Sequence, residues 1–360
     1  MDVFTDLLKQ NLPLLHKARL RAVAIFVLSL ISEATVNLQK LSLSGVARVK
    51  PESVYKRFSR LLIWVVSAKI DFGSLILKLS KKMNDCDLIL CMDRTNWKYG
   101  KMHINFLVMS LYINGVGYPI AWRLLPKRTK RGNSDTSHRI AIMQKVLKSL
   151  KPTQIKCLLM DKEFIGEDWL KWLNQQQITY IARIKDNALV NGKLSVKSYR
   201  KARSRKKMMQ TQVTIYGQSV YLSYKRITGK NRRSEYLFTA SNQVQGEAML
   251  ELYADRWSIE QMFSHWKSRG FDFECSHISN RKRLMGLIGL IALAYTIVHQ
   301  WGTQLNRKFA IKRKKHGYLA KSIFRYGLDH FRHALRMLEP GQTVIADILK
   351  PIFTNTSFVQ

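Results

Sequence analysis

Apolar residues recur at helical spacing through the first 70 residues of the chain. An apolar residue at every third or fourth position is typical of amphipathic helices that bury one face. The pattern predicts helices at residues 4–16, 20–32, 37–43 and 53–66. We therefore expect residues 1–80 to form an all-α N-terminal region.

The last of these helices carries basic residues between its apolar positions. It follows a short helix and a turn at Gly45, an arrangement that predicts a helix-turn-helix with its second helix in a DNA major groove. Lys56, Arg57 and Arg60 are its candidate DNA-binding residues. An ordinary basic helical bundle has the same pattern, and both interpretations stay open.

From residue 87 the helical spacing gives way to short apolar runs that predict strands. We expect strands at 88–92, 103–113, 118–125, 154–160 and 179–184, and helices at 137–150 and 167–176. Asn114-Gly115 lies between two of the strands and is a strong signal for a tight hairpin. A meander of three strands followed by strand–helix–strand predicts a mixed α/β sheet.

Residues 187–243 break this pattern and predict a β-rich basic insertion that is separate from the sheet. It contains strand-like runs at 212–216, 220–224 and 235–239. Residues 193–207 hold eight Lys or Arg and no acid. Five of them are candidate DNA contacts: Arg200, Lys201, Arg203, Arg205 and Lys206. A disordered, solvated loop is the alternative for so dense a run of charge.

Helices are expected again in the last third of the chain. A helix over residues 246–268 would bury an apolar stripe and present Tyr253, Arg256, Glu260 and Lys267 along the adjoining edge. Residues 284–300 form the longest apolar stretch, which is short for a bilayer span and predicts a buried core helix. Residues 301–360 are expected to form a C-terminal helical region.

The charge balance points to a polyanionic partner. The 360 residues include 61 Lys and Arg against 24 Asp and Glu, a net charge of +37. Duplex DNA or RNA accounts for this surplus better than a membrane surface does. The four cysteines lack metal-ligand spacing, and the N-terminus lacks the basic start of a signal peptide. We therefore expect a cytoplasmic protein in a reducing compartment.

Three acids suggest a metal site. Asp93 and Asp161 each follow an apolar strand, and Glu260 lies on a helix that must pack on the sheet. Their oxygens suit Mg²⁺, with Mn²⁺ as a substitute, and two such ions can activate water and stabilise a leaving oxygen in phosphodiester cleavage. Either Asp alone is as well explained as a helix cap or turn residue. Four nearby acids are rivals that the pattern does not exclude: Asp85, Asp87, Glu163 and Asp168.

These residues carry a resemblance to a known family. Tyr253, Arg256, Glu260 and Lys267 satisfy the spacing Y-x2-R-x3-E-x6-K. This string resembles the YREK signature of the insertion-sequence-4 family of DDE transposases. The segments around Asp93 and Asp161 look like the regions that hold that family's two aspartates. The resemblance covers residues 85–300.

The resemblance implies a ribonuclease H-like core over residues 85–186 and 244–300, interrupted by the insertion. It implies that Asp93, Asp161 and Glu260 bind two metal ions. Tyr253, Arg256 and Lys267 would hold the terminal phosphate of the element end. Trp257 would stack near a displaced base, while the alternative is a core residue at the edge of the apolar stripe.

The reaction implied is cut-and-paste transposition in a bacterial, nucleoid-associated protein. A nick at the element end gives a 3′-OH, which attacks the opposite strand to form a hairpin and, after the hairpin reopens, attacks target DNA. A homodimer would act on two terminal inverted repeats. A non-catalytic repressor derived from a transposase and a ribonuclease H-like nuclease or resolvase remain the alternatives. The intact acids and YREK residues argue against the repressor. A base-stacking Trp257 and a large basic insertion have no evident use in a nuclease or resolvase and argue against that alternative.

Overall fold

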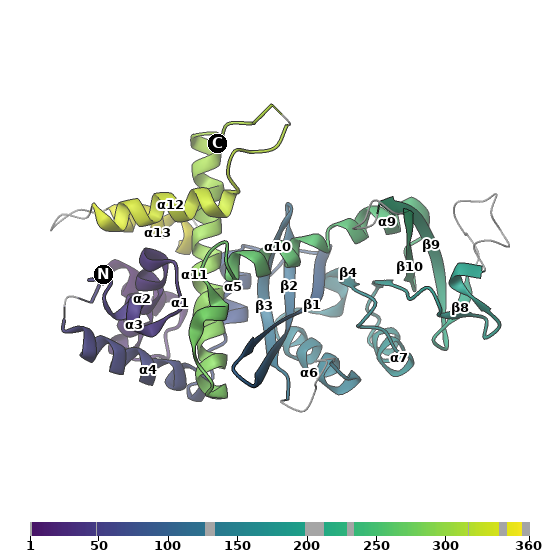
Figure 1. Ribbon diagram of the computed structural model, residues 1–360, viewed down its shortest axis with the longest axis horizontal. Coiled ribbons are helices and arrows are strands. Elements are labelled where there is room, and N and C mark those ends of the chain that lie inside the picture. Colours follow the sequence, from purple (N-terminus) through teal and green to yellow (C-terminus); the bar gives the residue numbers. More distant parts are fainter. Residues whose placement is uncertain are drawn as a thin grey trace. The chain divides into compact units, whose positions relative to one another are not determined.

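The computed structural model describes residues 2–47, 49–126, 134–198, 212–228, 234–315, 317–337 and 344–354. The chain forms two compact units (Figure 1). A helical unit combines Met1–Ser80, Lys98–Met102 and Phe263–Gln360. A sheet unit combines Lys81–Trp97 and His103–Met262.

The helical unit is built around one long apolar helix, α11 (Arg281–Lys308). Helices α2, α4, α5, α12 and α13 all pack against it. By length and composition α11 could cross a membrane, but 83% of its most apolar window is buried inside the protein. Its apolarity is therefore used in packing within this unit. The helices of the unit are α1 (Asp2–Asn11), α2 (Lys17–Glu33), α3 (Leu38–Ser42), α4 (Pro51–Ser67), α5 (Phe72–Leu79), α11, α12 (Ile323–Arg336) and α13 (Val344–Phe353), with a 3-10 turn at Phe273–Ser276.

Two of these helices, α5 and α13, lie in regions that were predicted to be helical, but no individual helix was predicted at either position. Each spans only eight to ten residues, and each buries most of its apolar side chains. Apolar residues do recur at helical spacing in both, but a segment of eight to ten residues is too short for that pattern to be decisive, and α13 also contains Pro351.

Gly286 allows α11 and α4 to approach closely, and this makes it a test of the helical core. A Cβ at this position would lie 2.0 Å from the backbone oxygen of Leu62 on α4. Gly286→Ala is therefore expected to lower the free energy of unfolding by roughly 1–3 kcal/mol, as overpacking does. Urea denaturation measures the change. A gain of about 0.5–1 kcal/mol, the usual effect of Gly→Ala in an open helix, would contradict the close contact.

The sheet unit contains one eight-stranded mixed sheet with the order β3-β2-β1-β4-β5-β10-β9-β8. β4 runs parallel to β1 and to β5, while the β2–β3, β5–β10, β9–β10 and β8–β9 pairs are antiparallel. Asn114 and Gly115 have positive φ angles of 49° and 85°, so the hairpin between β2 and β3 turns as its sequence predicts. The strands are β1 (Leu88–Tyr99), β2 (Met102–Ile113), β3 (Val116–Leu124), β4 (Ile155–Met160), β5 (Tyr180–Arg183), β8 (Val213–Ile215), β9 (Gln218–Thr228) and β10 (Ser234–Ser241).

Helices connect and cover these strands. α6 (Thr136–Leu147) packs on β3, and α7 (Glu167–Gln175) leads from β4 to β5. α9 (Gly246–Ala254) lies over β5, β9 and β10, and α10 (Trp257–Trp266) follows it. A 3-10 turn (Pro152–Gln154) precedes β4, and β6 (Leu189–Val190) and β7 (Leu194–Ser195) form a separate two-stranded ribbon.

Two sequence predictions about the sheet are wrong. The strands of residues 187–243 do not form a separate insertion sheet, because β10 pairs with β5 through Thr239–Arg183 and two further residue pairs. β5 would otherwise leave an unpaired edge, which an added strand satisfies. The first strand also does not end before Asp93, since β1 continues to Tyr99.

Candidate active site

Register in the parallel part of the sheet brings the two aspartates together. The pairing of β1 with β4 ends at Met92 and Met160, and Asp93 and Asp161 are the next residues of the two segments. Side chains at matching positions of parallel neighbours point to the same face. Both carboxylates therefore leave the sheet at one place, where the paired part of the parallel strands ends.

One arginine bridges Asp93 to Glu260. The Arg256 guanidinium donates from Nη1 to Asp93 Oδ2 at 3.1 Å and from Nη2 to Glu260 Oε1 at 2.5 Å. The Arg256 side chain is only 11% exposed, against 16% for Asp93 and 34% for Glu260. A paired charge in so closed a setting is held far more firmly than a surface ion pair.

Burial changes the protonation chemistry of this pair. It raises the pKa of Asp93 to about 7, and the neighbouring Arg256 and the Arg94 amide reduce that shift without cancelling it. For Arg256, burial acts to lower the pKa, but Tyr253, Asp93 and Glu260 act in the opposite direction and the net pKa is raised. Arg256 is therefore a fixed cation, while Asp93 can exchange a proton near neutral pH.

Asp161 has its own polar neighbours. The Tyr253 hydroxyl donates to Asp161 Oδ1 at 3.5 Å, and Arg183 Nη1 lies 3.9 Å from the same oxygen. The Arg256 guanidinium carbon lies 5.6 Å from the centre of the Tyr253 ring, which links the two halves of the site. The Tyr253 pKa is raised by burial, so the phenol remains protonated.

The predicted single helix over residues 246–268 is wrong in one respect that matters to the site. The chain forms two helices, and a turn at Asp255 and Arg256 separates them. Four backbone hydrogen bonds in this stretch join residues three apart, for example Arg256 N to Tyr253 O at 3.2 Å. Bonds of this type tighten the backbone and rotate the side chains away from their α-helical positions. Tyr253 therefore comes from α9 and Glu260 from α10.

The turn packs tightly on the sheet. A Cβ on Gly117 of β3 would lie 3.1 Å from the Ser258 carbonyl oxygen, a tight contact that glycine avoids. The Cys91 thiol lies 3.9 Å from both the Asp255 carbonyl oxygen and the Ser258 hydroxyl. These contacts fix the start of α10, and with it Glu260, against β1 and β3.

The other candidate DNA-binding residues lie elsewhere. Trp257 is 57% exposed, which excludes the alternative that it is a core residue. Lys267 lies one residue beyond α10, in the helical unit, and pairs with Glu274 at 2.8 Å. Three candidates are exposed on α4: Lys56, Arg57 and Arg60. Five lie outside the described residues: Arg200, Lys201, Arg203, Arg205 and Lys206.

Sequence reasoning missed two arginines. Arg94 forms a two-point ion pair with Glu163 at 3.0 and 3.1 Å, and its amide donates to Asp93 Oδ1 at 2.7 Å. Arg183 follows Ala182, the β5 partner of Met160, so the parallel register that places Asp161 also places Arg183. Adjacency to Asp93 in the sequence was the available signal for Arg94, and a position near the end of the predicted strand 179–184 was the signal for Arg183.

Three of the rival acids have contacts or positions that the sequence pattern did not indicate. Glu163 is bound by Arg94, Asp85 pairs with Lys82, and Asp168 is exposed in the first turn of α7. An acidic side chain in the first turn of a helix interacts favourably with the helix dipole and stabilises the helix.

The donor set suits a hard cation. Within the described residues, no three His, Cys, Asp or Glu side chains are grouped closely enough to hold a metal ion. The Arg256 guanidinium lies between Asp93 and Glu260 and supplies the positive charge that balances these two acids. Carboxylate oxygens around a cationic position match the ligand preference of Mg²⁺ and Mn²⁺.

Fold and site together define an α/β protein with acidic residues at the end of parallel strands and an arginine that lies between two of them. Residues 85–297 match the family model of the transposase DDE domain. This match covers more than half of the chain, and the chain belongs to that family. DDE transposases cleave DNA and transfer strands, and they generally depend on divalent metal ions.

The chain was also compared with curated proteins and with solved structures. No curated protein matches the chain. Among solved structures, the piggyBac transposase synaptic complex with hairpin DNA aligns with a TM-score of 0.46 and 14% identity. The alignment covers 96% of this chain and 78% of that one.

Proposed function

We propose that this chain is the transposase of a bacterial insertion sequence of the insertion-sequence-4 family, and that it acts by cut-and-paste. The observation that carries the proposal is the Arg256 bridge between Asp93 and Glu260. These three residues stand at YREK and first-aspartate positions, and 163 residues separate Asp93 from Arg256. Arg256 and Glu260 are only four positions apart and would be neighbours in any helix, so the support comes from the contact between Arg256 and the distant Asp93.

We further propose that the sheet unit is a ribonuclease H-like core. Support comes from the meander β1–β3, with β4 added parallel to β1 and β5 added parallel to β4. Residues 85–186 and 244–300 would form this core, residues 187–243 a β-rich basic insertion, residues 1–80 a helical DNA-binding domain and residues 301–360 a C-terminal helical region. The β5–β10 pairing means that the insertion would extend the core sheet.

Each residue of the site receives a role. Asp93, Asp161 and Glu260 would hold two Mg²⁺ ions, with Mn²⁺ able to substitute. The bound metal supplies Lewis-acid activation of water and stabilisation of the leaving oxygen. Tyr253, Arg256 and Lys267 would hold the terminal phosphate, and an arginine fork suits a phosphate geometrically. Trp257, being exposed, is available to stack on a displaced base.

The partners follow from charge and reaction. A net charge of +37 supports binding of double-stranded DNA, both the terminal inverted repeats and the target. Lys56, Arg57 and Arg60 are exposed and would contact DNA from α4. We propose a homodimer that holds two element ends, in the bacterial cytoplasm at the nucleoid. Hairpin formation at the cut end would precede strand transfer to target DNA.

A cleavage assay tests the proposal directly. Purified protein and Mg²⁺ are incubated with DNA that carries the sequences flanking this gene, and the products are resolved on a denaturing gel. We expect a nick at the element boundary and then a hairpin-sized product, both absent with Glu260→Gln. Tight binding without any metal-dependent product would favour the repressor interpretation. Equal cleavage of branched DNA that lacks element ends would favour a nuclease.

A further inference from the structure

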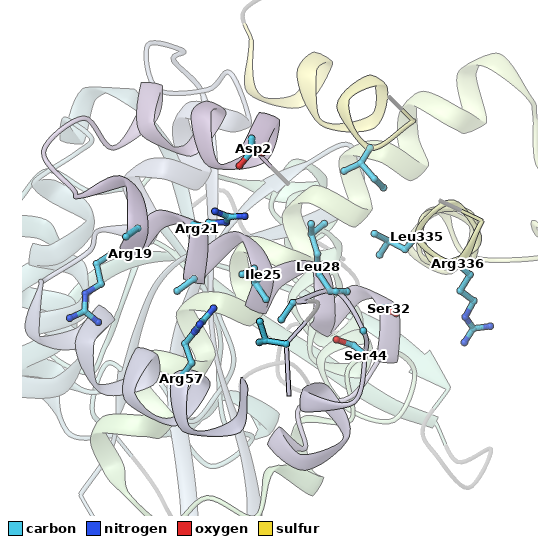
Figure 2. Close-up of a pocket in the computed structure, with 17 residues that line it drawn as sticks. Asp2, Arg19, Arg21, Ile25, Leu28, Ser32, Ser44, Arg57, Leu335 and Arg336 are labelled. Carbon is cyan, nitrogen blue, oxygen red and sulfur yellow. The ribbon is translucent and has the colours of Figure 1, made fainter. Parts of the chain in front are cut away.

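The helical unit contains a large cavity that the proposed chemistry does not use. Its volume is about 1110 Å³, and its lining comes from α1, α2, α4, α12, α13 and the connection between α3 and α4 (Figure 2). Pockets for small ligands span roughly 300–1,000 Å³. The cavity therefore suits an extended ligand better than a single small ion.

Arginines surround this cavity, which we call the arginine groove. Its charged residues are Arg19, Arg21, Arg57, Arg336 and one acid, Asp2. Figure 2 shows Arg21 and Arg57 on one side of Ile25 and Leu28, with Arg336 on the other side. The groove thus carries an excess of three positive charges from three different helices.

These arginines lack anionic partners among the described residues. None of the four forms an ion pair with another described side chain, although ten such pairs occur among the described residues. The Arg19 guanidinium carbon lies 5.4 Å from the centre of the Trp64 ring, which holds its charge in place. The pKa of nearby Arg332 is lowered first by burial and then by Arg336 and Arg325. An anion bound here would relieve this repulsion.

The floor of the groove is aliphatic. Ile25, Leu28, Val46, Val49 and Ile345 line it. A ligand must therefore combine regularly spaced anions with less polar surface between them. The backbone of DNA does this, because phosphates alternate with deoxyribose rings, and arginine forks bind phosphate oxygens in a bidentate manner.

We propose that the arginine groove binds the sugar–phosphate backbone of duplex DNA, independently of base sequence. The assignment rests on the proposed function for the presence of DNA, and it adds a contact formed jointly by the N-terminal helix α2 and the C-terminal helix α12. It also gives Arg57 a different task from the one predicted for it. Arg57 contacts a phosphate from the rim of the groove, while Lys56 and Arg60 remain on the outside of α4. Such contacts position the protein on the duplex without reading bases.

Salt dependence of DNA binding tests this assignment. The double variant Arg21→Gln/Arg336→Gln is compared with Lys314→Gln/Lys315→Gln, which removes equal charge from exposed residues of the same unit outside the groove lining. The probe is a short duplex of random sequence, and a chelator excludes divalent metal. Loss of two phosphate contacts should reduce the slope of log K against log salt by about 1.8. Affinity at moderate salt should fall by roughly 100-fold.

The control pair should change affinity by no more than about threefold and leave the slope nearly unchanged. Arg21→Lys/Arg336→Lys keeps the charge and should restore most of the slope. Thermal melting of each variant identifies any loss of folding. If Arg21→Gln/Arg336→Gln (the groove pair) and Lys314→Gln/Lys315→Gln (the control pair) changed duplex affinity and the salt slope equally, the assignment would be overturned.

A poly-glutamate peptide of similar charge is the second probe. Tighter binding of this peptide than of the duplex, lost in the groove pair, would assign the groove to an acidic protein partner and overturn the proposal. The binding assay does not depend on cleavage, so its result can contradict the arginine groove without contradicting the proposed transposase function, and the reverse. A wild-type protein that cannot cut, but whose groove pair loses duplex affinity, would remove the proposed function and keep the groove.

Discussion

Asp93→Asn and Asp161→Asn are each expected to lower the rate of DNA cleavage by at least about 100-fold. Mutation of residues that only hydrogen-bond to a metal ligand already lowers metal affinity or activity by roughly 10–100-fold, and the loss of a ligand itself should cost more. Both changes keep side-chain size and remove one anionic oxygen from the place where the β1–β4 pairing ends. A neutral amide is a poor ligand for a hard cation. Cleavage of the flanking DNA, measured under single-turnover conditions with Mg²⁺, gives the effect.

Asp168→Asn is the matched control for these variants. Asp168 is one of the rival acids that the sequence pattern does not exclude, but it is exposed in the first turn of α7. We expect this change to leave cleavage within about threefold, because an exposed acid at a helix start contributes roughly 0.3–1 kcal/mol to stability. Duplex affinity in the absence of metal should be similar in all three variants. Full cleavage by Asp93→Asn or Asp161→Asn would remove that residue from the catalytic set.

The sequence predicted most of the sheet unit because its signals are local. The Asn114-Gly115 turn, the apolar runs and the intervening helices each depend on neighbours in the chain. The two aspartates were found in the same way, since each follows an apolar run. Parallel pairing then brings them together without any further information.

The errors concern choices that the local pattern does not contain. Nothing in residues 234–241 specifies that they pair with β5, because that choice depends on which strand edge is left open. The turn at Asp255 and Arg256 has good helix-forming neighbours, and its shape follows from packing of Ser258 against Gly117. Tertiary contact overrides helix propensity there.

The same turn explains why the predicted row of site residues is only partly assembled. A continuous helix would place Tyr253, Arg256, Glu260 and Lys267 along one edge. In the structure Arg256 instead lies between the acids, and Lys267 pairs with Glu274. Spacing alone selected these residues as candidates, but it did not predict their partners.

Arg256→Gln is expected to have two opposite effects, tighter divalent-metal binding and slower DNA cleavage. In the wild type, a metal ion at Asp93 and Glu260 must displace a guanidinium held at 3.1 and 2.5 Å. Hydrogen bonds to charged groups contribute about 1.5–3 kcal/mol each, so their removal should strengthen metal binding by roughly tenfold or more. The cleavage rate should fall because the phosphate loses its arginine.

Binding of Mn²⁺ to the DNA-free protein, followed by calorimetry or electron paramagnetic resonance, measures the first effect apart from catalysis. The pH must lie well above the Asp93 pKa of about 7, because a protonated carboxyl does not bind the ion and because Arg256 itself lowers that pKa. Arg183→Gln is the control, since its guanidinium is 3.9 Å from Asp161 and should compete less. If Arg256→Gln bound Mn²⁺ no better than wild type, the guanidinium would not be a competitor.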